Sequence, residues 1–106
     1  ISQPYTIAFM LQLLNAKQHH TILEIGSGTG YVLALLSHII KQGTCIGIEL
    51  NQSLAVKSKH LLTNDHNIDI FNKNGFEGSP HKAPFDRILI SAAADTIPSP
   101  LSTNLR

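Results

Sequence analysis

Three glycines stand at every second position directly after an apolar run, at Gly26, Gly28 and Gly30. Residues 23–25 precede them and an amphipathic pattern begins at Tyr31, which indicates a buried strand, a tight turn and the start of a helix. Because glycine has no Cβ atom, a ligand can lie against the backbone of such a turn. The first amides of the helix lack partners within the helix and can bind that ligand. The pattern predicts a ligand-binding loop rather than an ordinary connection.

The residues around the loop narrow the class of ligand. A phosphate-binding loop of the nucleotide type needs Lys and then Ser or Thr after its last glycine, whereas Tyr31 and Val32 follow Gly30 here. The dinucleotide fingerprint needs a glycine at its sixth position for close packing of helix on sheet, and Tyr31 occupies that position. The shorter pattern Glu-x-Gly-x-Gly-x-Gly remains. It suits a nucleoside with a small amino-acid tail, and S-adenosylmethionine is a ligand of that kind.

Two acidic side chains could contact such a ligand. Glu49 ends the next apolar run, where a carboxylate can accept hydrogen bonds from both ribose hydroxyls. The alternative for Glu49 is an exposed acid at the end of a strand. Glu24 lies inside an apolar run, and an unpaired buried carboxylate is costly. Glu24 should therefore bond to loop amides or a helix terminus, or to the ammonium group of the ligand, and both roles stay open.

The periodicity of apolar side chains predicts the elements that position these residues. Helices are expected over residues 5–16, 31–41 and 54–63, and strands over residues 21–25, 45–50, 68–72 and 85–91. Ser53 is the expected N-cap of the third helix, and Gly43 ends the second. Residues 73–84 contain glycines and prolines and are expected to form a loop. The buried side of the second helix is expected to carry Val32, Leu35, Leu36, Ile39 and Ile40.

The alternation of helices and strands is typical of parallel βαβ units and so of the α/β class. Right-handed crossovers would place the second and third strands on one side of the first. The fourth strand passes to the other side if the glycine loop marks a topological switch point. The expected strand order is 3-2-1-4, with the ligand at the carboxyl ends of the strands.

Composition sets bounds on partners and compartment. The chain has 106 residues, which fits a single domain, and its net charge of +1 gives no reason to expect a nucleic acid or an anionic membrane as partner. Its apolar runs are far shorter than a membrane span. One cysteine, Cys45, cannot form an internal disulfide, which suits a reducing cytoplasm.

Other chemistry-bearing residues predict no further site. The histidines show no strong metal-ligand spacing, and most fall on expected turns or polar helix faces, so they are interpreted as scattered surface residues and no metal is expected. Asp86 and Arg87 are interpreted as a charged pair where a strand begins rather than as catalytic groups. The histidines are His19, His20, His38, His60, His66 and His81.

Three segments carry a resemblance to a known family. They are Ile-Ser-Gln-Pro-Tyr-Thr at 1–6, Leu-Glu-Ile-Gly-Ser-Gly-Thr-Gly-Tyr at 23–31 and Asp-Arg-Ile-Leu-Ile-Ser-Ala-Ala-Ala at 86–94. Together they resemble the protein-L-isoaspartate O-methyltransferases. Most class I methyltransferases share the glycine motif, whereas the outer segments are more specific. The resemblance implies a Rossmann-like three-layer αβα fold. It also implies protein repair, by methyl transfer from S-adenosylmethionine to the free α-carboxylate of L-isoaspartyl residues in damaged proteins.

The resemblance also implies roles for single residues. Ser2 would be catalytic, because its hydroxyl orients the acceptor carboxylate, although Ser2 is also a good N-cap. Glu49 would bind the ribose. Asn74 stands where the family usually has Asp against the adenine amino group, so it would accept without charge assistance. The other expected cofactor contacts are Ile1, Gln3, Ile7, Glu24, Gly26, Ser27, Gly28, Gly30 and Gly75, and Ala92, Ala93 and Ala94 would leave space for the substrate.

The resemblance covers nearly all of the chain but only the middle of a family member. We therefore expect residues 1–106 to form a single partial S-adenosylmethionine-binding methyltransferase domain without the C-terminal strands of the family. The fourth strand would then be an exposed apolar edge, so the piece alone is expected to be poorly soluble or inactive. The full-length form would be a cytoplasmic monomer that acts on isoaspartyl proteins. Two alternatives stay open, namely a class I methyltransferase with a small-molecule acceptor and an inactive fragment that at most binds nucleoside.

Overall fold

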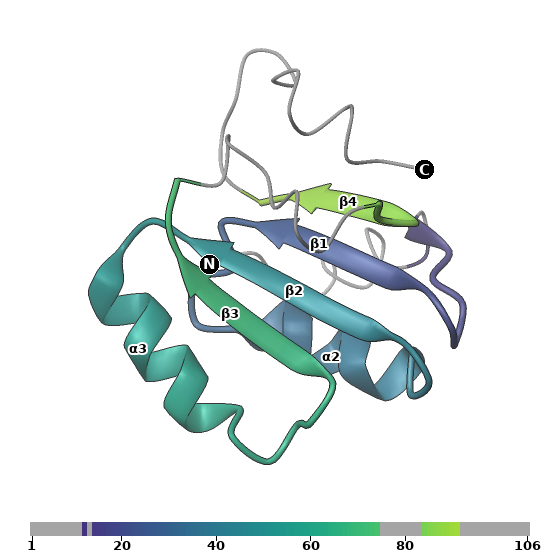
Figure 1. Ribbon diagram of the computed structural model, residues 1–106, viewed down its shortest axis with the longest axis horizontal. Coiled ribbons are helices and arrows are strands. Elements are labelled where there is room, and N and C mark those ends of the chain that lie inside the picture. The colour runs from purple at the N-terminus through teal and green to yellow at the C-terminus, as the bar shows by residue number, and fades with distance from the viewer. Residues whose placement is uncertain (1–11, 13, 75–83, 92–106) are drawn as a thin grey trace.

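A computed structural model of the chain describes residues 12, 14–74 and 84–91. Within this part, four strands and two helices form an α/β arrangement (Figure 1). The sheet order is β3-β2-β1-β4 with every neighbouring pair parallel, so the predicted order is confirmed. The elements are β1 (Thr21–Ile25), α2 (Tyr31–Ile39), β2 (Thr44–Glu49), α3 (Gln52–Leu61), β3 (Ile68–Asn72) and β4 (Arg87–Ile90).

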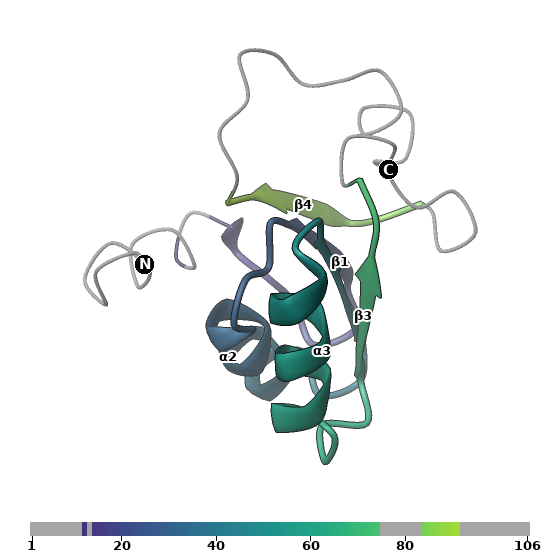
Figure 2. The same cartoon turned by 90° about the vertical axis from the view of Figure 1, so that its left-hand side faces the viewer.

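Helices α2 and α3 lie on the same face of the sheet (Figure 2). Side chains on a strand alternate between the two faces, so Ile22 and Cys45 meet the helices while their neighbours point to the opposite face. The opposite face is also buried, which explains the nearly continuous apolar runs of the two central strands. The helix-facing core contains Ile22, Leu33, Leu36, Ile40, Cys45, Ala55 and Ile70, and the opposite core contains Leu23, Ile25, Ile46, Ile48 and Phe85.

Cys45 is completely buried in the helix-facing core. Burial raises the pKa of its thiol to about 12, and the nearby Glu24 carboxyl adds a smaller contribution in the same direction. The thiol is therefore protonated and enclosed in the native state.

The buried side of α2 differs from the predicted one. Leu33, Leu36 and Ile40 are buried, whereas Ile39 is 41% exposed. Apolar side chains occur on most sides of this helix, so periodicity alone does not select the side that packs. The loop that ends at Gly30 fixes where the first turn begins and thereby sets the orientation of the helix.

The predicted N-cap of α3 was wrong by two residues. The Asn51 side chain, not that of Ser53, accepts a hydrogen bond from the Leu54 N–H over 3.0 Å, and the helix begins at Gln52. Asn and Ser are equally good caps, so the sequence did not distinguish them. The expected helix over residues 5–16 lies outside the described residues except for 12 and 14–16, so the three-layer arrangement stays a prediction.

Gly43 joins α2 to β2 at a point where two backbone segments are in close contact. Its N–H donates to the Ile40 carbonyl over 2.8 Å, and the Thr44 N–H donates to the His20 carbonyl over 3.1 Å. A Cβ atom at position 43 would overlap the His20 carbonyl oxygen. Helix α2 ends at Ile39 with Ile40 as its C-cap, so the prediction that Gly43 ends this helix was wrong. Glycine is required at position 43 by the close approach of the chain before β1.

Asp86 and Arg87 both bond to the backbone near the amino end of β1. The Asp86 carboxylate accepts from the Thr21 N–H over 2.8 Å, and the Arg87 guanidinium donates to the Leu14 carbonyl over 2.8 Å. These contacts anchor the start of the sheet and lie at the end opposite the glycine loop. None of the helices in the described part of the chain is long and apolar enough to cross a membrane.

Candidate functional site

The glycine loop joins β1 to α2 and folds over the end of β2. The N–H groups of Gly26 and Ser27 both donate to the Ile48 carbonyl, over 2.8 and 3.2 Å. Gly26, Gly28 and Gly30 have φ angles of 77°, 57° and 86°, a region that other residues rarely adopt. The three glycines are therefore required first by the turn that brings the loop to the carboxyl ends of β1 and β2.

The glycines differ in what lies beside them. Apart from its chain neighbours, no described residue comes within 4 Å of the place where a Cβ of Gly28 would stand. A Cβ at Gly30 would lie 2.7 Å from Leu62 Cδ1 and 3.4 Å from Ser58 Cβ. Only Gly28 of these two leaves open space, whereas Gly30 lets the loop pack against α3.

The Glu49 carboxylate connects this loop to the start of α3. It is 8% exposed, its Oε1 accepts from the Gly28 N–H over 2.7 Å, and its Oε2 accepts from the Asn51 N–H over 2.8 Å. The Asn72 amide donates to the Glu49 carbonyl over 2.9 Å, which adds the end of β3 to the same cluster. Glu49 is thus not the exposed acid of the alternative interpretation. Each carboxylate oxygen keeps a second lone pair for another donor.

Glu24 is buried at the carboxyl end of β1, with 1% exposure. Its Oε2 accepts from the Ser91 hydroxyl over 2.7 Å. The pKa of Glu24 is raised to about 7 as the net result of three causes: burial raises it, the Ser91 hydrogen bond lowers it in part, and the charge of Glu49 raises it. Among the described residues, no partner is found for Glu24 Oε1 or for the buried hydroxyl of Ser27. Because buried polar groups are normally satisfied, these two atoms indicate a polar ligand or water.

Replacing Glu24 by Gln is expected to remove one source of pH dependence from the free energy of unfolding. The unfolded carboxyl loses its proton near its ordinary pKa of 4.5, whereas the folded one holds it to about pH 7. The contribution of this carboxyl to the free energy of unfolding is therefore full below pH 4.5 and is lost as the pH rises to about 7. The loss is roughly 3 kcal/mol in total. Glu24→Gln should exceed the parent in stability at about pH 8 by up to that amount.

Urea unfolding of the purified parent and variant at several pH values measures this difference directly. The gap should close as the pH falls toward the ordinary pKa of Glu. Asp69→Asn is a matched control, since it makes the same change of acid to amide at an exposed residue of β3. A constant difference between Glu24→Gln and the parent at all pH values would contradict the prediction.

Not every predicted site residue falls in the described part of the chain. The structure brings together Glu24, Gly26, Ser27, Gly28, Gly30 and Glu49 at the carboxyl ends of β1 and β2. Asn74 is exposed two residues after β3 ends, beyond the strand that pairs with β2. The other predicted residues lie outside the described residues and stay predictions: Ile1, Ser2, Gln3, Ile7, Gly75, Ala92, Ala93 and Ala94.

Three further residues lie at this site and were not predicted from the sequence. Asn51 and Ser91 hold the two carboxylates by the contacts given above. Leu50 follows Glu49 and is 72% exposed, which is unusual for a large apolar side chain. An apolar residue directly after the acid at a strand end was the available signal for Leu50.

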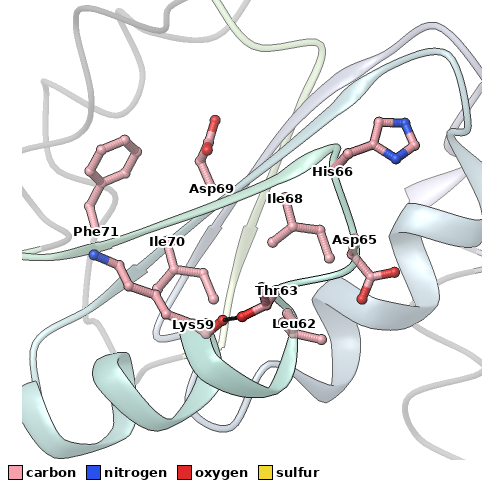
Figure 3. Close-up of a pocket in the computed structure, with 9 residues that line it drawn as sticks. All are labelled: Lys59, Leu62, Thr63, Asp65, His66, Ile68, Asp69, Ile70 and Phe71. Carbon is pink, nitrogen blue, oxygen red and sulfur yellow. Dashed lines mark hydrogen bonds between the residues drawn. The ribbon is translucent and has the colours of Figure 1, made fainter.

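A hollow of about 380 Å³ lies elsewhere, between the end of α3 and the outer edge of β3 (Figure 3). Ile68 and Ile70 point toward the helix in this view, and Asp69 points to the other side of the strand. Ligands of open α/β sheets bind at the carboxyl ends of the strands, and no residue of the glycine loop lines this hollow. Within residues 12, 14–74 and 84–91, no three His, Cys, Asp or Glu side chains gather as metal ligands.

Comparison with known proteins identifies the family. Residues 1–106 match the family model for protein-L-isoaspartate(D-aspartate) O-methyltransferase. The chain belongs to this family. The resemblance drawn from the sequence motifs is therefore confirmed.

Curated relatives support the same family. The chain is 42% identical over 103 residues to protein-L-isoaspartate O-methyltransferase 2 of Anaeromyxobacter sp. (strain Fw109-5), with 95% of this chain and 42% of that protein covered. It is 39% identical over 108 residues to protein-L-isoaspartate O-methyltransferase 1 of Polaromonas sp. (strain JS666 / ATCC BAA-500), with coverage of 100% and 45%. The chain thus spans less than half the length of these two relatives.

Solved structures of the family share the fold. One protein-L-isoaspartate O-methyltransferase superposes with a TM-score of 0.95 at 26% identity, covering all of this chain and 34% of that one. A putative member from Plasmodium falciparum, solved in complex with S-adenosyl-L-homocysteine, gives 0.84 at 25% identity and covers 57% of that chain. A precorrin-6y C5,15-methyltransferase from Geobacter metallireducens gives 0.88 at 19% identity, which shows the fold alone.

Proposed function

We propose that the protein transfers a methyl group from S-adenosylmethionine to the α-carboxylate of L-isoaspartyl residues in damaged proteins. The observation that carries the proposal is the match of the whole chain to the isoaspartate methyltransferase family, together with a site whose free polar atoms suit the donor. A relative from Plasmodium falciparum was solved with S-adenosyl-L-homocysteine, the product of such a transfer. We infer that residues 1–106 form part of the domain that binds this cofactor.

The described residues fit an aminoacyl nucleoside. Open space beside Gly28 leaves room over the loop, and Glu24 Oε1 and Ser27 Oγ are buried polar atoms without partners among the described residues. Glu24 could accept from the ammonium group of the amino-acid tail, which would favour the charged carboxylate. Ser27 could donate to or accept from the same tail. These residues would therefore hold the part of the donor next to its sulfur.

Glu49 would hold the ribose of the donor. Its two oxygens already bond the Gly28 and Asn51 N–H groups, and their second lone pairs can accept from two neighbouring hydroxyls. The backbone bonds fix the carboxylate before any ligand arrives, so little ordering is needed on binding. Leu50, exposed beside it, offers an apolar surface for the base, and Asn74 offers an amide for the base's polar edge.

The chemistry needs positioning more than acid–base catalysis. The donor, when bound, supplies a methyl group already activated on a positive sulfur. The acceptor carboxylate is ionised at neutral pH, so no proton has to be removed. The protein must desolvate this carboxylate and align it behind the methyl group. We propose Ser2 as the residue that orients the acceptor and Ala92, Ala93 and Ala94 as the small residues beside the substrate backbone.

A pair of matched peptides tests this function. The purified full-length protein is expected to transfer labelled methyl groups to a peptide that contains one L-isoaspartyl residue and not to the same peptide with L-aspartate. The two peptides are isomers of equal charge and composition that differ only in which carboxyl group of the aspartate forms the peptide bond. Equal methylation of both, or of a small molecule instead, would favour a class I methyltransferase with another acceptor. Binding of S-adenosylhomocysteine without any transfer would favour a fragment that only binds nucleoside.

A cytoplasmic location and a monomeric full-length form remain predictions. Fractionation of cells and light scattering of the purified protein measure them.

A further inference from the structure

Ser91 lies at the carboxyl end of β4 and contacts a buried acid on the neighbouring strand. Its backbone N–H donates to the Ile25 carbonyl over 2.8 Å and so continues the pairing of β4 with β1. Glu24 pairs with Leu89 in this register, and the alternation of side chains places Ser91 two positions further on the same face. The Ser91 hydroxyl donates to Glu24 Oε2 over 2.7 Å.

This bond holds one of the two oxygens of the Glu24 carboxyl. The side chain is 1% exposed, and its other oxygen, Oε1, is buried without a partner among the described residues. The charged or acidic groups that face Glu24 from the neighbouring strand β2 are Glu49 and the Cys45 thiol. Neither group is a cation, and no hydrogen bond from either reaches Oε1, so Oε1 remains an acceptor available to a ligand.

We propose that Ser91 is a positioning residue that holds Glu24 so that Oε1 receives the ammonium group of an aminoacyl nucleoside. This inference rests on the proposed function. Ser91 then confers a preference for nucleosides that carry an amino-acid tail over those that lack one. Burial raises the pKa of Glu24, and the Ser91 hydrogen bond opposes this rise because a donor stabilises the carboxylate form. The carboxylate form is the one that attracts the ammonium group.

The test compares two nucleosides that differ in the tail. Calorimetry measures the binding of S-adenosylhomocysteine and of 5′-methylthioadenosine, which lacks the amino-acid part, to the purified parent and to Ser91→Ala. The variant should bind S-adenosylhomocysteine roughly tenfold more weakly, since a hydrogen bond to a charged group is lost, and should bind methylthioadenosine as the parent does. Ser91→Thr keeps the hydroxyl and should restore the affinity. Ser37→Ala is the matched control, because it removes a hydroxyl that, among the described residues, bonds the Ala34 carbonyl alone.

A pH series separates positioning from a general structural role. Affinity for S-adenosylhomocysteine should rise with pH as Glu24 ionises, and in Ser91→Ala the midpoint of this rise should move to higher pH because the carboxylate has lost its donor. Equal losses for both nucleosides, or an unchanged midpoint, would overturn the role of Ser91 and leave the proposed function standing, since the parent still binds S-adenosylhomocysteine. A parent that binds neither nucleoside would overturn both.

Discussion

Glu49→Ala is expected to weaken the binding of S-adenosylhomocysteine roughly 10- to 100-fold, about 1–3 kcal/mol, and to lower the stability of the fold by about 2 kcal/mol. The loss of affinity follows from the loss of the acceptor proposed for the ribose. The loss of stability is expected because the Gly28 and Asn51 N–H groups donate to this carboxylate and would lose their acceptor. One substitution thus affects the ligand, the loop and the start of α3.

Calorimetry and urea unfolding of the purified protein measure the two effects separately. Glu49→Gln should be intermediate in both, because an amide has one acceptor oxygen for the two N–H groups that face it. Asp69→Ala removes an exposed carboxylate from β3 and should change neither quantity. Unchanged affinity for S-adenosylhomocysteine in Glu49→Ala would refute the ribose role, even if the fold were weakened.

Gly43→Ala is expected to destabilise the fold by about 4 kcal/mol or more, which is exceptional for the addition of one methyl group. The new Cβ would overlap the carbonyl oxygen of His20 and would also lie 3.1 Å from the carbonyl carbon of His19. All of these atoms belong to the backbone and cannot rotate away as a side chain can. Moving the segment would break the hydrogen bond from the Thr44 N–H to the His20 carbonyl, at the point where β2 begins beside β1.

The midpoint of urea unfolding measures this change, with an unaltered slope if the unfolding remains two-state. Gln42→Ala is a suitable control, because Gln42 is the exposed neighbour of Gly43 and its contact with the Gln18 carbonyl is made by the backbone N–H, which the substitution keeps. A Gly43→Ala variant as stable as the Gln42→Ala control would mean that the two segments can separate without cost.

The sheet was predictable because its strands have clear signals at both ends. The predicted bounds of β1 and β3 agree with the structure, since polar turn residues precede each of them. The strand order was predictable because chain connectivity and the glycine loop leave few arrangements. The orientation of α2 and the cap of α3 were not, because several residues there satisfy the same local preference and only packing selects among them.

The residues of the candidate site were predictable where short local patterns mark them. Gly26, Gly28 and Glu49 were recognised from local pattern, and the structure brings them together. The contact between Ser91 and Glu24 joins residues far apart in the chain, so no local pattern reports it. The different requirements for Gly28 and Gly30 were also hidden, since they are distinguished by Ser58 on α3 and by Leu62 directly after this helix.

The enclosed thiol of Cys45 gives this protein an internal probe of its own opening. A thiol reagent reacts with the thiolate. In the native state, burial excludes the reagent from Cys45 and also keeps its thiol protonated. Labelling must therefore wait for the helix-facing core to separate from the sheet, and its rate follows the population of that open form when reclosing is fast. A nucleoside that binds only the closed form should slow labelling by the factor 1 + L/Kd, where L is its free concentration. One native cysteine thus reports ligand affinity without an introduced label.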